Sequence, residues 1–280
     1  MLMSSIEGVT SVVAVGSCKG GVGKTTVSVN LALALRRMGS EVGLFDADLY
    51  GPNVPLMLGL RTKKSHEPFA FQNKATGKAV SFIPLYSKEE RRYIEPIQKF
   101  GVHVMSLGLW FTEKYVARDS SFLANQLIAQ VLADIKWPPL DYLIVDLPPG
   151  TGTLLQTIVA RIGIDGMLLV TTPQDMTLLD SGRSLELFRS EGINVLGRIE
   201  NMSYLLCPKC SERIEVFSTG YEDWTVLQDL DLLGAIPLNQ RYAKPVDAYH
   251  PFTQVDTHSR ETEPFLEIAK DVKNRLAEEN

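Results

Sequence analysis

A glycine-rich stretch near the start of the chain carries residue types that bind phosphate. Residues 16–26 read GSCKGGVGKTT. In such a turn between a strand and a helix, backbone N–H groups converge on an anion, and glycine lets the backbone approach it. Lys24 is placed to add positive charge at the β- and γ-phosphates, and the Thr25 hydroxyl to bind Mg²⁺. The predicted nucleotide-binding residues here are Gly20, Gly21, Val22, Gly23, Lys24, Thr25 and Thr26.

Three aspartates follow apolar segments that read as strands. Asp46 and Asp48 lie in DAD after EVGLF, and Asp146 ends DYLIVD. Because strand ends of a parallel sheet face the ligand crevice, we expect the three carboxylates to meet the phosphate loop. Asp46 is predicted to lie near the metal, and Asp146 to contact Mg²⁺ through water. An aspartate at a strand end is often only a helix cap, so the prediction depends on the phosphate loop beside it.

A pair of cysteines, Cys207 and Cys210, has the C-x-x-C spacing. Two thiolates at this spacing can chelate one metal centre, but they supply two of the four ligands that zinc or an iron–sulfur cluster needs. The sequence has no second C-x-x-C, and its four histidines are scattered. A redox dithiol, a zinc half-site or inert thiols, and a four-thiolate site on the two-fold axis of a dimer all stay open. The dithiol is disfavoured because the motif does not open a helix of a βαβ unit.

Strand and helix patterns alternate along the chain. Apolar, β-branched runs predict strands, and 3.6-residue spacing with a following Gly39 predicts the first helix. The alternation indicates an α/β fold, a mostly parallel sheet with helices on both faces, in a single domain over residues 1–280. A cysteine-bearing insertion interrupts it around 201–223, and residues 61–99 read as a hairpin or irregular excursion. Strands are expected at 10–16, 41–46, 141–146, 166–172 and 193–201, and helices at 24–38, 120–135, 153–161, 176–190 and 261–279.

Composition excludes several classes of partner. The chain has 280 residues, 45% of them apolar, and a formal net charge of −5. No run of 18 apolar residues is present and the N-terminus does not read as a secretion signal, so we expect no membrane partner. The negative charge disfavours nucleic acid. Three cysteines do not suggest a disulfide framework, and the cytoplasm is the expected compartment.

The segment KGGVGKTT resembles the deviant Walker A motif of a family of P-loop ATPases. That family contains the septum-site, partition, nitrogenase-iron-protein and arsenite ATPases. The resemblance implies a P-loop NTPase three-layer sandwich that hydrolyses ATP, slowly, to ADP and phosphate. It also implies that Lys19 reaches across a homodimer to the partner's nucleotide and that Asp48 orients the attacking water. The predicted catalytic residues are therefore Lys19, Lys24 and Asp48, with Thr25, Asp46 and Asp146 at Mg²⁺.

Four further segments narrow the resemblance. DADLYGPNVPLMLG, DYLIVDLPPGTGT, VTTPQDMTLLD and IENMSYLLCPKC, in this order, resemble the Mrp/ApbC-type iron–sulfur cluster carrier ATPases between Val12 and Asn239. The resemblance implies ATP and Mg²⁺ as ligands and a labile [4Fe–4S] cluster held between the Cys207 and Cys210 pairs of a homodimer. The cluster would pass to apo iron–sulfur proteins. Asn201 matches the position that contacts adenine, although a turn residue at a strand end is the simpler interpretation of an asparagine there.

Two departures from the family pattern and two alternatives remain. Cys18 replaces the first glycine of the loop, where a small residue suffices, and Thr153 replaces the aspartate usual after PPGTG. A zinc or nickel insertion chaperone would use the same thiolates, since these accept several soft metals, and zinc is a possible occupant in place of the cluster. A positioning switch on membrane or DNA is disfavoured because the terminal helix is acidic and no basic surface stripe is expected.

Overall fold

The structure is a computed structural model of the whole chain. It describes residues 6–49, 51–60, 71–72, 79–80, 94–109, 128–129, 131–173, 185–207, 209–216, 229–239 and 262–278. Within these ranges no helix is long and apolar enough to cross a membrane.

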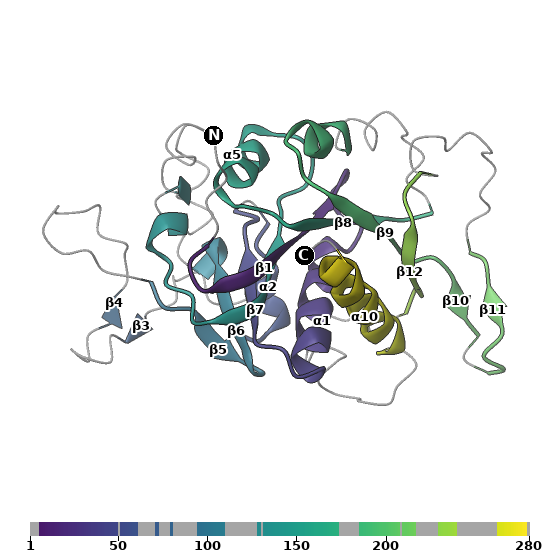
Figure 1. Cartoon of the computed structure of the whole chain (residues 1–280). Helices are drawn as coiled ribbons and strands as arrows, with labels where there is room; N and C mark the ends of the chain where they lie inside the picture. The colour runs from purple at the N-terminus through teal and green to yellow at the C-terminus, as the bar shows by residue number, and fades with distance from the viewer. Residues whose placement is uncertain are drawn as a thin grey trace, which may run out of the picture.

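An eight-stranded sheet forms the centre of the molecule (Figure 1). Its strand order is β12-β9-β8-β1-β7-β2-β6-β5, and all neighbours are parallel except β5, which pairs antiparallel with β6. The predicted mostly parallel sheet is confirmed. The strands are β1 (Val9–Ser17), β2 (Val42–Asp46), β5 (Ile97–Lys99), β6 (Val102–Ser106), β7 (Leu140–Asp146), β8 (Gly166–Thr171), β9 (Val195–Asn201) and β12 (Leu232–Ile236).

Alternation along the central strands builds two apolar cores, one on each face of the sheet. In β1, Val13 and Val15 belong to one buried cluster, and Val12 and Ala14 belong to the other. Successive side chains of a strand point to opposite faces, so a strand apolar at every position must be covered twice. The helices α1 (Lys24–Arg37), α2 (Val54–Met57) and α10 (Glu263–Glu278) contribute to the first cluster, and α5 (Thr153–Arg161) with residues 131–135 and 185–188 to the second.

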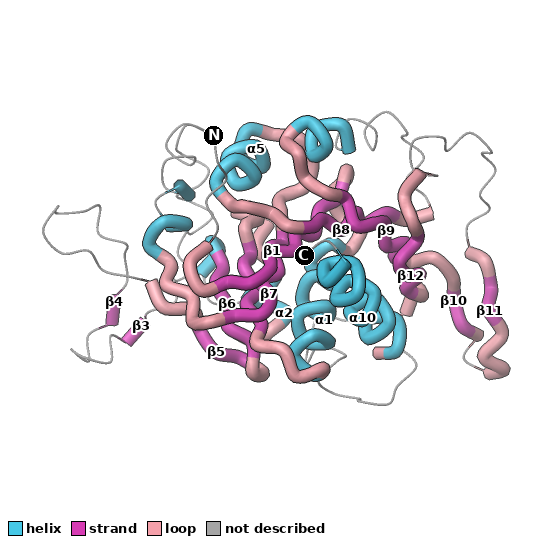
Figure 2. Tube along the Cα trace, viewed as in Figure 1, coloured by secondary structure: helices cyan, strands magenta, loops and turns pink. Residues whose placement is uncertain are grey.

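Figures 1 and 2 show the resulting layers, with α1 and α10 side by side on one face of the sheet and α5 on the other. This is the three-layer arrangement expected for a P-loop NTPase. Helix α1 begins after Gly23 and ends before Gly39, whose φ of 90° is the left-handed stop predicted from the sequence. Helix α5 has the predicted bounds, and α10 matches the predicted terminal helix within two residues.

Other predicted elements fall partly outside the described residues. The helices predicted at 120–135 and 176–190 are seen only as helical residues 128–129, 131–134 and 185–190. In the segment 61–99, β3 (Phe71–Gln72) and β4 (Ala79–Val80) pair antiparallel, which is the predicted hairpin. Strands β6 and β12 were not predicted. Both are short, and β12 carries a glycine, so neither gives a strong strand pattern.

The cysteine-bearing insertion begins directly after β9. Strands β10 (Leu205–Leu206) and β11 (Arg213–Ile214) form a separate two-stranded sheet, and the two cysteines lie in the turn between them. We call residues 203–216 the cysteine hairpin. In Figure 1 it projects beyond β12, at the edge of the central sheet opposite β5.

Candidate functional site

The phosphate loop connects the end of β1 to the start of α1. Gly21 and Gly23 have φ angles of 84° and 88°, a region that favours glycine. Gly23 is required for a second reason, because a Cβ there would lie 2.1 Å from the Asn201 amide nitrogen. The Ser17 hydroxyl donates to the Lys19 carbonyl at 2.8 Å and closes the start of the loop. The chain thus turns sharply into α1. The backbone N–H groups in the first turn of this helix point toward the loop.

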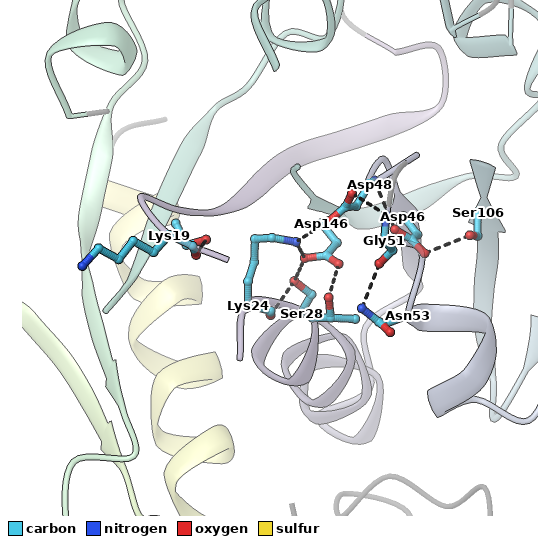
Figure 3. A network of polar contacts seen from close by, with 11 residues as sticks. Lys19, Lys24, Ser28, Asp46, Asp48, Gly51, Asn53, Ser106 and Asp146 are labelled. Carbon is cyan, nitrogen blue, oxygen red and sulfur yellow. Dashed lines mark hydrogen bonds and ion pairs between the residues drawn. The ribbon is translucent and has the colours of Figure 1, made fainter. Parts of the chain in front are cut away.

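Asp146, at the end of β7, accepts hydrogen bonds from three side chains of α1 (Figure 3). The Lys24 ammonium lies 2.7 Å from Oδ1, and the Thr25 hydroxyl donates to Oδ2 at 2.7 Å. The Ser28 hydroxyl lies 2.9 Å from Oδ1, and Asp146 and Ser28 are both fully buried. The two groups predicted to bind phosphate and Mg²⁺ are therefore held by the carboxylate predicted to assist them.

Asp46 is the neighbour of Asp146 across the sheet, since the two residues are paired in register at the ends of β2 and β7. It is fully buried, its Oδ2 accepts the Ser106 hydroxyl at 2.9 Å, and its Oδ1 accepts the Asp48 N–H at 3.2 Å. Burial, and then the nearby Asp146 carboxylate, raise the pKa of Asp46 well above its ordinary value. The Lys24 ammonium lies among the carboxylates of Asp46, Asp48 and Asp146 and offsets part of their negative charge.

Asp48, two residues after the end of β2, borders a cavity of about 360 Å³. Its Oδ1 accepts the Gly51 N–H at 3.0 Å, and its Oδ2 is 4.0 Å from the Lys24 ammonium. The cavity is also lined by Pro148, Pro149 and Gly152 of the loop that follows β7. That loop contacts the phosphate loop through the Gly150 N–H, which donates to the Ser17 carbonyl at 3.3 Å.

Lys19 and Asn201 lie apart from the carboxylates. In Figure 3 the Lys19 side chain extends away from Lys24 and Asp146. It does not join the three aspartates within its own chain. Asn201, buried at the end of β9, donates from its amide nitrogen to the Val22 carbonyl at 2.8 Å. It therefore touches the phosphate loop directly.

The cysteine hairpin presents its two thiols in one tight turn. The Cys207 N–H donates to the Glu212 carbonyl at 2.9 Å, and the Cys207 carbonyl accepts the Ser211 N–H at 2.8 Å. Backbone N–H groups of Cys210 and Lys209, and the Cys210 thiol, hydrogen-bond the Cys207 sulfur and lower its pKa. Cys207 is half-buried and Cys210 is exposed. These hydrogen bonds favour the thiolate of Cys207, the form that binds metal.

At the cysteine hairpin, the described residues supply only part of a metal centre. In the described part of the chain, no three His, Cys, Asp or Glu side chains converge closely enough to hold a metal ion. Glu212 is the nearest carboxylate to Cys210, at 4.0 Å from its sulfur. The donor set is therefore two soft thiolates on an exposed turn, which fits a centre completed from outside the chain.

Two buried serines of the site were not predicted from the sequence. Ser28 lies one helical turn beyond Lys24, so the period of α1 was a signal that it faces the same way. Ser106 ends β6, a strand that the sequence pattern did not show, and nothing near it resembles a motif. All the predicted residues of the phosphate loop and the three aspartates come together at one edge of the sheet, whereas Cys207 and Cys210 lie apart from them.

The sequence matches a known protein family and several known proteins over most of its length. A family model described as ParA, NUBPL iron-transfer P-loop NTPase, matches residues 8–273. The chain is 34% identical over 273 residues to the iron–sulfur cluster carrier protein of Haemophilus influenzae, covering 97% of this chain and 68% of that protein. It is 35% identical over 274 residues to the iron–sulfur cluster transfer protein NUBPL of Mus musculus, covering 97% and 79%.

Solved structures show the same fold. A nucleotide-binding protein from Archaeoglobus fulgidus in complex with ADP has 28% sequence identity and a TM-score of 0.66, covering 93% of each chain. The cell division ATPase MinD of Pyrococcus furiosus has 21% identity and a TM-score of 0.62, covering 95% of this chain and 99% of that one, and it supports the fold alone. By its matching model and its relatives, the chain belongs to the NUBPL family of iron-transfer P-loop NTPases.

Proposed function

We propose that the protein is an ATPase that carries a [4Fe–4S] cluster at a homodimer interface and transfers it to apo-proteins. One observation supports this most directly. A single chain combines a phosphate loop locked onto a strand-end aspartate with a two-thiolate turn that cannot complete a metal centre alone. Relatives named as iron–sulfur cluster carrier proteins match almost the whole chain, so the proposal extends a shared family role to these residues.

The nucleotide half of the mechanism follows from the contacts of Asp146. Bound ATP would draw the Lys24 ammonium from Asp146 to its β- and γ-phosphates, against the backbone N–H groups of Gly20–Gly23. Thr25 would bind Mg²⁺ directly, Asp146 would contact it through water, and Asp46 would lie close to it. The metal would neutralise charge on the phosphates. Asp48, at the boundary of the cavity, would orient the attacking water. Lys19 points away from its own site, which suits contact with the nucleotide of a second copy.

The cargo half depends on symmetry. A two-fold dimer would bring two copies of Cys207 and Cys210 together, which gives the four thiolates that a [4Fe–4S] cluster needs. Because both thiols lie on a projecting hairpin and Cys210 is exposed, a recipient protein's thiolates can reach the cluster and replace them. Slow hydrolysis would time the opening of the dimer, and apo iron–sulfur proteins are the proposed recipients.

Anaerobic reconstitution with iron and sulfide tests the cargo half. We expect the wild type to develop the absorbance of a [4Fe–4S] cluster at two cysteine pairs per cluster, and Cys207→Ala/Cys210→Ala to develop none. Cys18→Ala is the matched control and should load normally. A cluster that survives the double substitution would contradict the site. Tight zinc uptake with no iron uptake by the wild type would instead favour a metal-insertion chaperone.

Nucleotide binding and turnover test the ATPase half. Lys24→Ala should abolish ATP binding because it removes the charge at the β- and γ-phosphates. Lys19→Ala should bind ATP but hydrolyse it more slowly by about 10³-fold or more if it acts in trans as an arginine finger does. Lys270→Ala, which removes an exposed lysine of α10, is the control for lost charge. Unchanged turnover in Lys19→Ala would remove its trans role.

A further inference from the structure

Ser106 is a buried hydroxyl at the catalytic edge to which the proposed mechanism gives no part. It ends β6 and has no exposed surface. Its register partner on the neighbouring strand is Asp46, which in turn pairs with Asp146. Three polar side chains thus stand next to one another at the ends of three parallel strands. Burying a hydroxyl group costs free energy unless it is hydrogen-bonded. The hydrogen-bond partners of Ser106 therefore indicate what its side chain does.

Both hydrogen-bonding capacities of Ser106 are used. Its hydroxyl donates to Asp46 Oδ2 at 2.9 Å and accepts the Gly108 N–H at 3.1 Å. The accepted bond fixes the direction in which the hydroxyl proton points, because the oxygen receives one hydrogen from the backbone and gives its own to the carboxylate. Ser106 therefore selects one orientation of the Asp46 carboxyl group (Figure 3).

The orientation of Asp46 is transmitted to Asp48. With Oδ2 held by Ser106, Oδ1 of Asp46 accepts the backbone N–H of Asp48 at 3.2 Å. Just after β6, Gly108 lies close to the same turn, since a Cβ at Gly108 would lie 2.2 Å from the Pro52 side chain. The Asp48 carboxylate then accepts the Gly51 N–H at 3.0 Å. Asp46 and Pro52 are thus both contacted by residues at or just after the end of β6.

We infer that Ser106 is a positioning residue for ATP hydrolysis, acting through Asp46 to hold the Asp48 carboxylate where the attacking water must be oriented. The inference rests on the proposed function, because it needs Asp48 to act on that water. Ser106 contacts neither the phosphate loop nor Lys24 in the hydrogen bonds that the structure shows. Its loss should therefore affect the chemical step more than nucleotide binding.

Steady-state hydrolysis measured across a range of ATP concentrations separates these two effects. For Ser106→Ala we expect kcat to fall by about 10-fold or more while KM for ATP changes by less than about 2-fold. Ser106→Thr, which keeps the hydroxyl, should recover most of the rate. Ser40→Ala is the matched control. Ser40 is also buried, and its hydroxyl accepts one hydrogen bond, from Lys273 at 3.0 Å, but it lies outside the site.

A double-mutant cycle tests the route through Asp46. In an Asp46→Asn background, Ser106→Ala should change kcat by less than about 2-fold, because the group through which it acts has been altered. Additive losses would overturn the route. Equal losses of binding and turnover in Ser106→Ala, or wild-type turnover, would overturn the positioning role.

The remaining outcomes are also decisive. Should Ser106→Ala fail to fold, Ser106→Cys keeps the volume with only a weak donor and carries the same expectation. Failure of both to fold would assign Ser106 to folding and overturn the inference. Wild-type protein that binds but never hydrolyses ATP would overturn the proposed ATPase and this inference together, whereas active wild type with an equally active Ser106→Ala overturns the inference alone.

Discussion

At the scale of single residues, Asp146 carries more hydrogen bonds than its predicted role requires. Lys24, Thr25 and Ser28 all donate to its carboxylate within 2.9 Å. In the proposed mechanism, ATP and Mg²⁺ draw Lys24 and Thr25 away, since these are the groups proposed to bind the phosphates and the metal. Of the three, Ser28 alone has no proposed contact with the ligand. It is therefore the donor that keeps Asp146 oriented in the loaded state.

Removal of the Ser28 hydroxyl should weaken the magnesium site. For Ser28→Ala we expect the Mg²⁺ concentration at half-maximal hydrolysis to rise by about 10-fold, the usual effect of losing a group that orients a metal-binding side chain. Hydrolysis rates measured across a Mg²⁺ titration at saturating ATP give this value. Ser40→Ala serves as the control for a lost buried hydroxyl. A titration curve identical to the wild type would show that Asp146 needs no support from Ser28.

At the scale of elements, helix α5 begins without the interactions that usually stabilise a helix N-terminus. Its N-cap is Gly152, with no side-chain hydrogen bond to the first turn, and that turn contains no acidic residue. The sequence has Thr153 where the resembling carriers have an aspartate. An acidic side chain at the start of a helix interacts favourably with the macrodipole and the unpaired N–H groups. The element is held instead by the buried Leu154, Leu155 and Ile158.

Thr153→Asp should therefore stabilise the protein. We expect a gain of about 0.3–1 kcal/mol in the free energy of unfolding, because Thr153 is exposed and the new carboxylate faces the helix N-terminus. Urea denaturation at low ionic strength measures the gain, and added salt should reduce it. Thr153→Asn controls for the shape of the side chain without the charge. A loss of stability would mean that nearby carboxylates such as Asp48 outweigh the helix.

The sequence predicted those elements whose pattern is local. The run VVAVG of β1 and the glycines around α1 specify a buried strand, a turn and a helix without reference to the rest of the chain. Strand β6 contains the polar residues His103 and Ser106, so its sequence alone does not predict a strand. Its pairing with β2 is what makes this segment a strand. Ser106 could not be predicted for the same reason, since its partner Asp46 is 60 residues away. The phosphate loop, by contrast, is fixed by neighbours in sequence.

At the scale of the whole molecule, β9 connects the nucleotide site to the cysteine hairpin. Asn201 at its end donates to Val22 of the phosphate loop, and the hairpin begins two residues later. The hairpin's first residues continue the pairing with the end of β12 and the chain after it, through the Ser203 N–H to Ile236 and the Leu238 N–H to Tyr204. Any shift of the phosphate loop on binding ATP would therefore reach Cys207 by a short path, through the Asn201 hydrogen bond and the backbone that follows Asn201.

Asn201→Ala should break this connection. At saturating ATP, we expect the variant to keep its cluster but to lose the effect of ATP on the rate of cluster transfer, because the side chain that joins β9 to the loop is gone. Transfer to an apo-ferredoxin, followed with and without ATP, measures the effect. Asn194→Ala, at an exposed position before the start of the same strand, is the control. An ATP effect that persists in Asn201→Ala would place the coupling elsewhere, such as in the dimer contact of Lys19.

The fold itself should not depend on the cargo. Among the described residues, neither apolar core includes a side chain of the cysteine hairpin, and the turn is closed by backbone hydrogen bonds. A structural zinc site, by contrast, provides the folding free energy of its domain. We therefore expect Cys207→Ser/Cys210→Ser to unfold within about 3 °C of the metal-free wild type, a shift that corresponds to at most about 2 kcal/mol in a chain of this size. Calorimetry of both proteins, with ATP affinity measured alongside, gives the comparison. Unfolding of the wild type by a chelator would contradict the separation, because it would make the metal centre part of the fold and not a passenger on it.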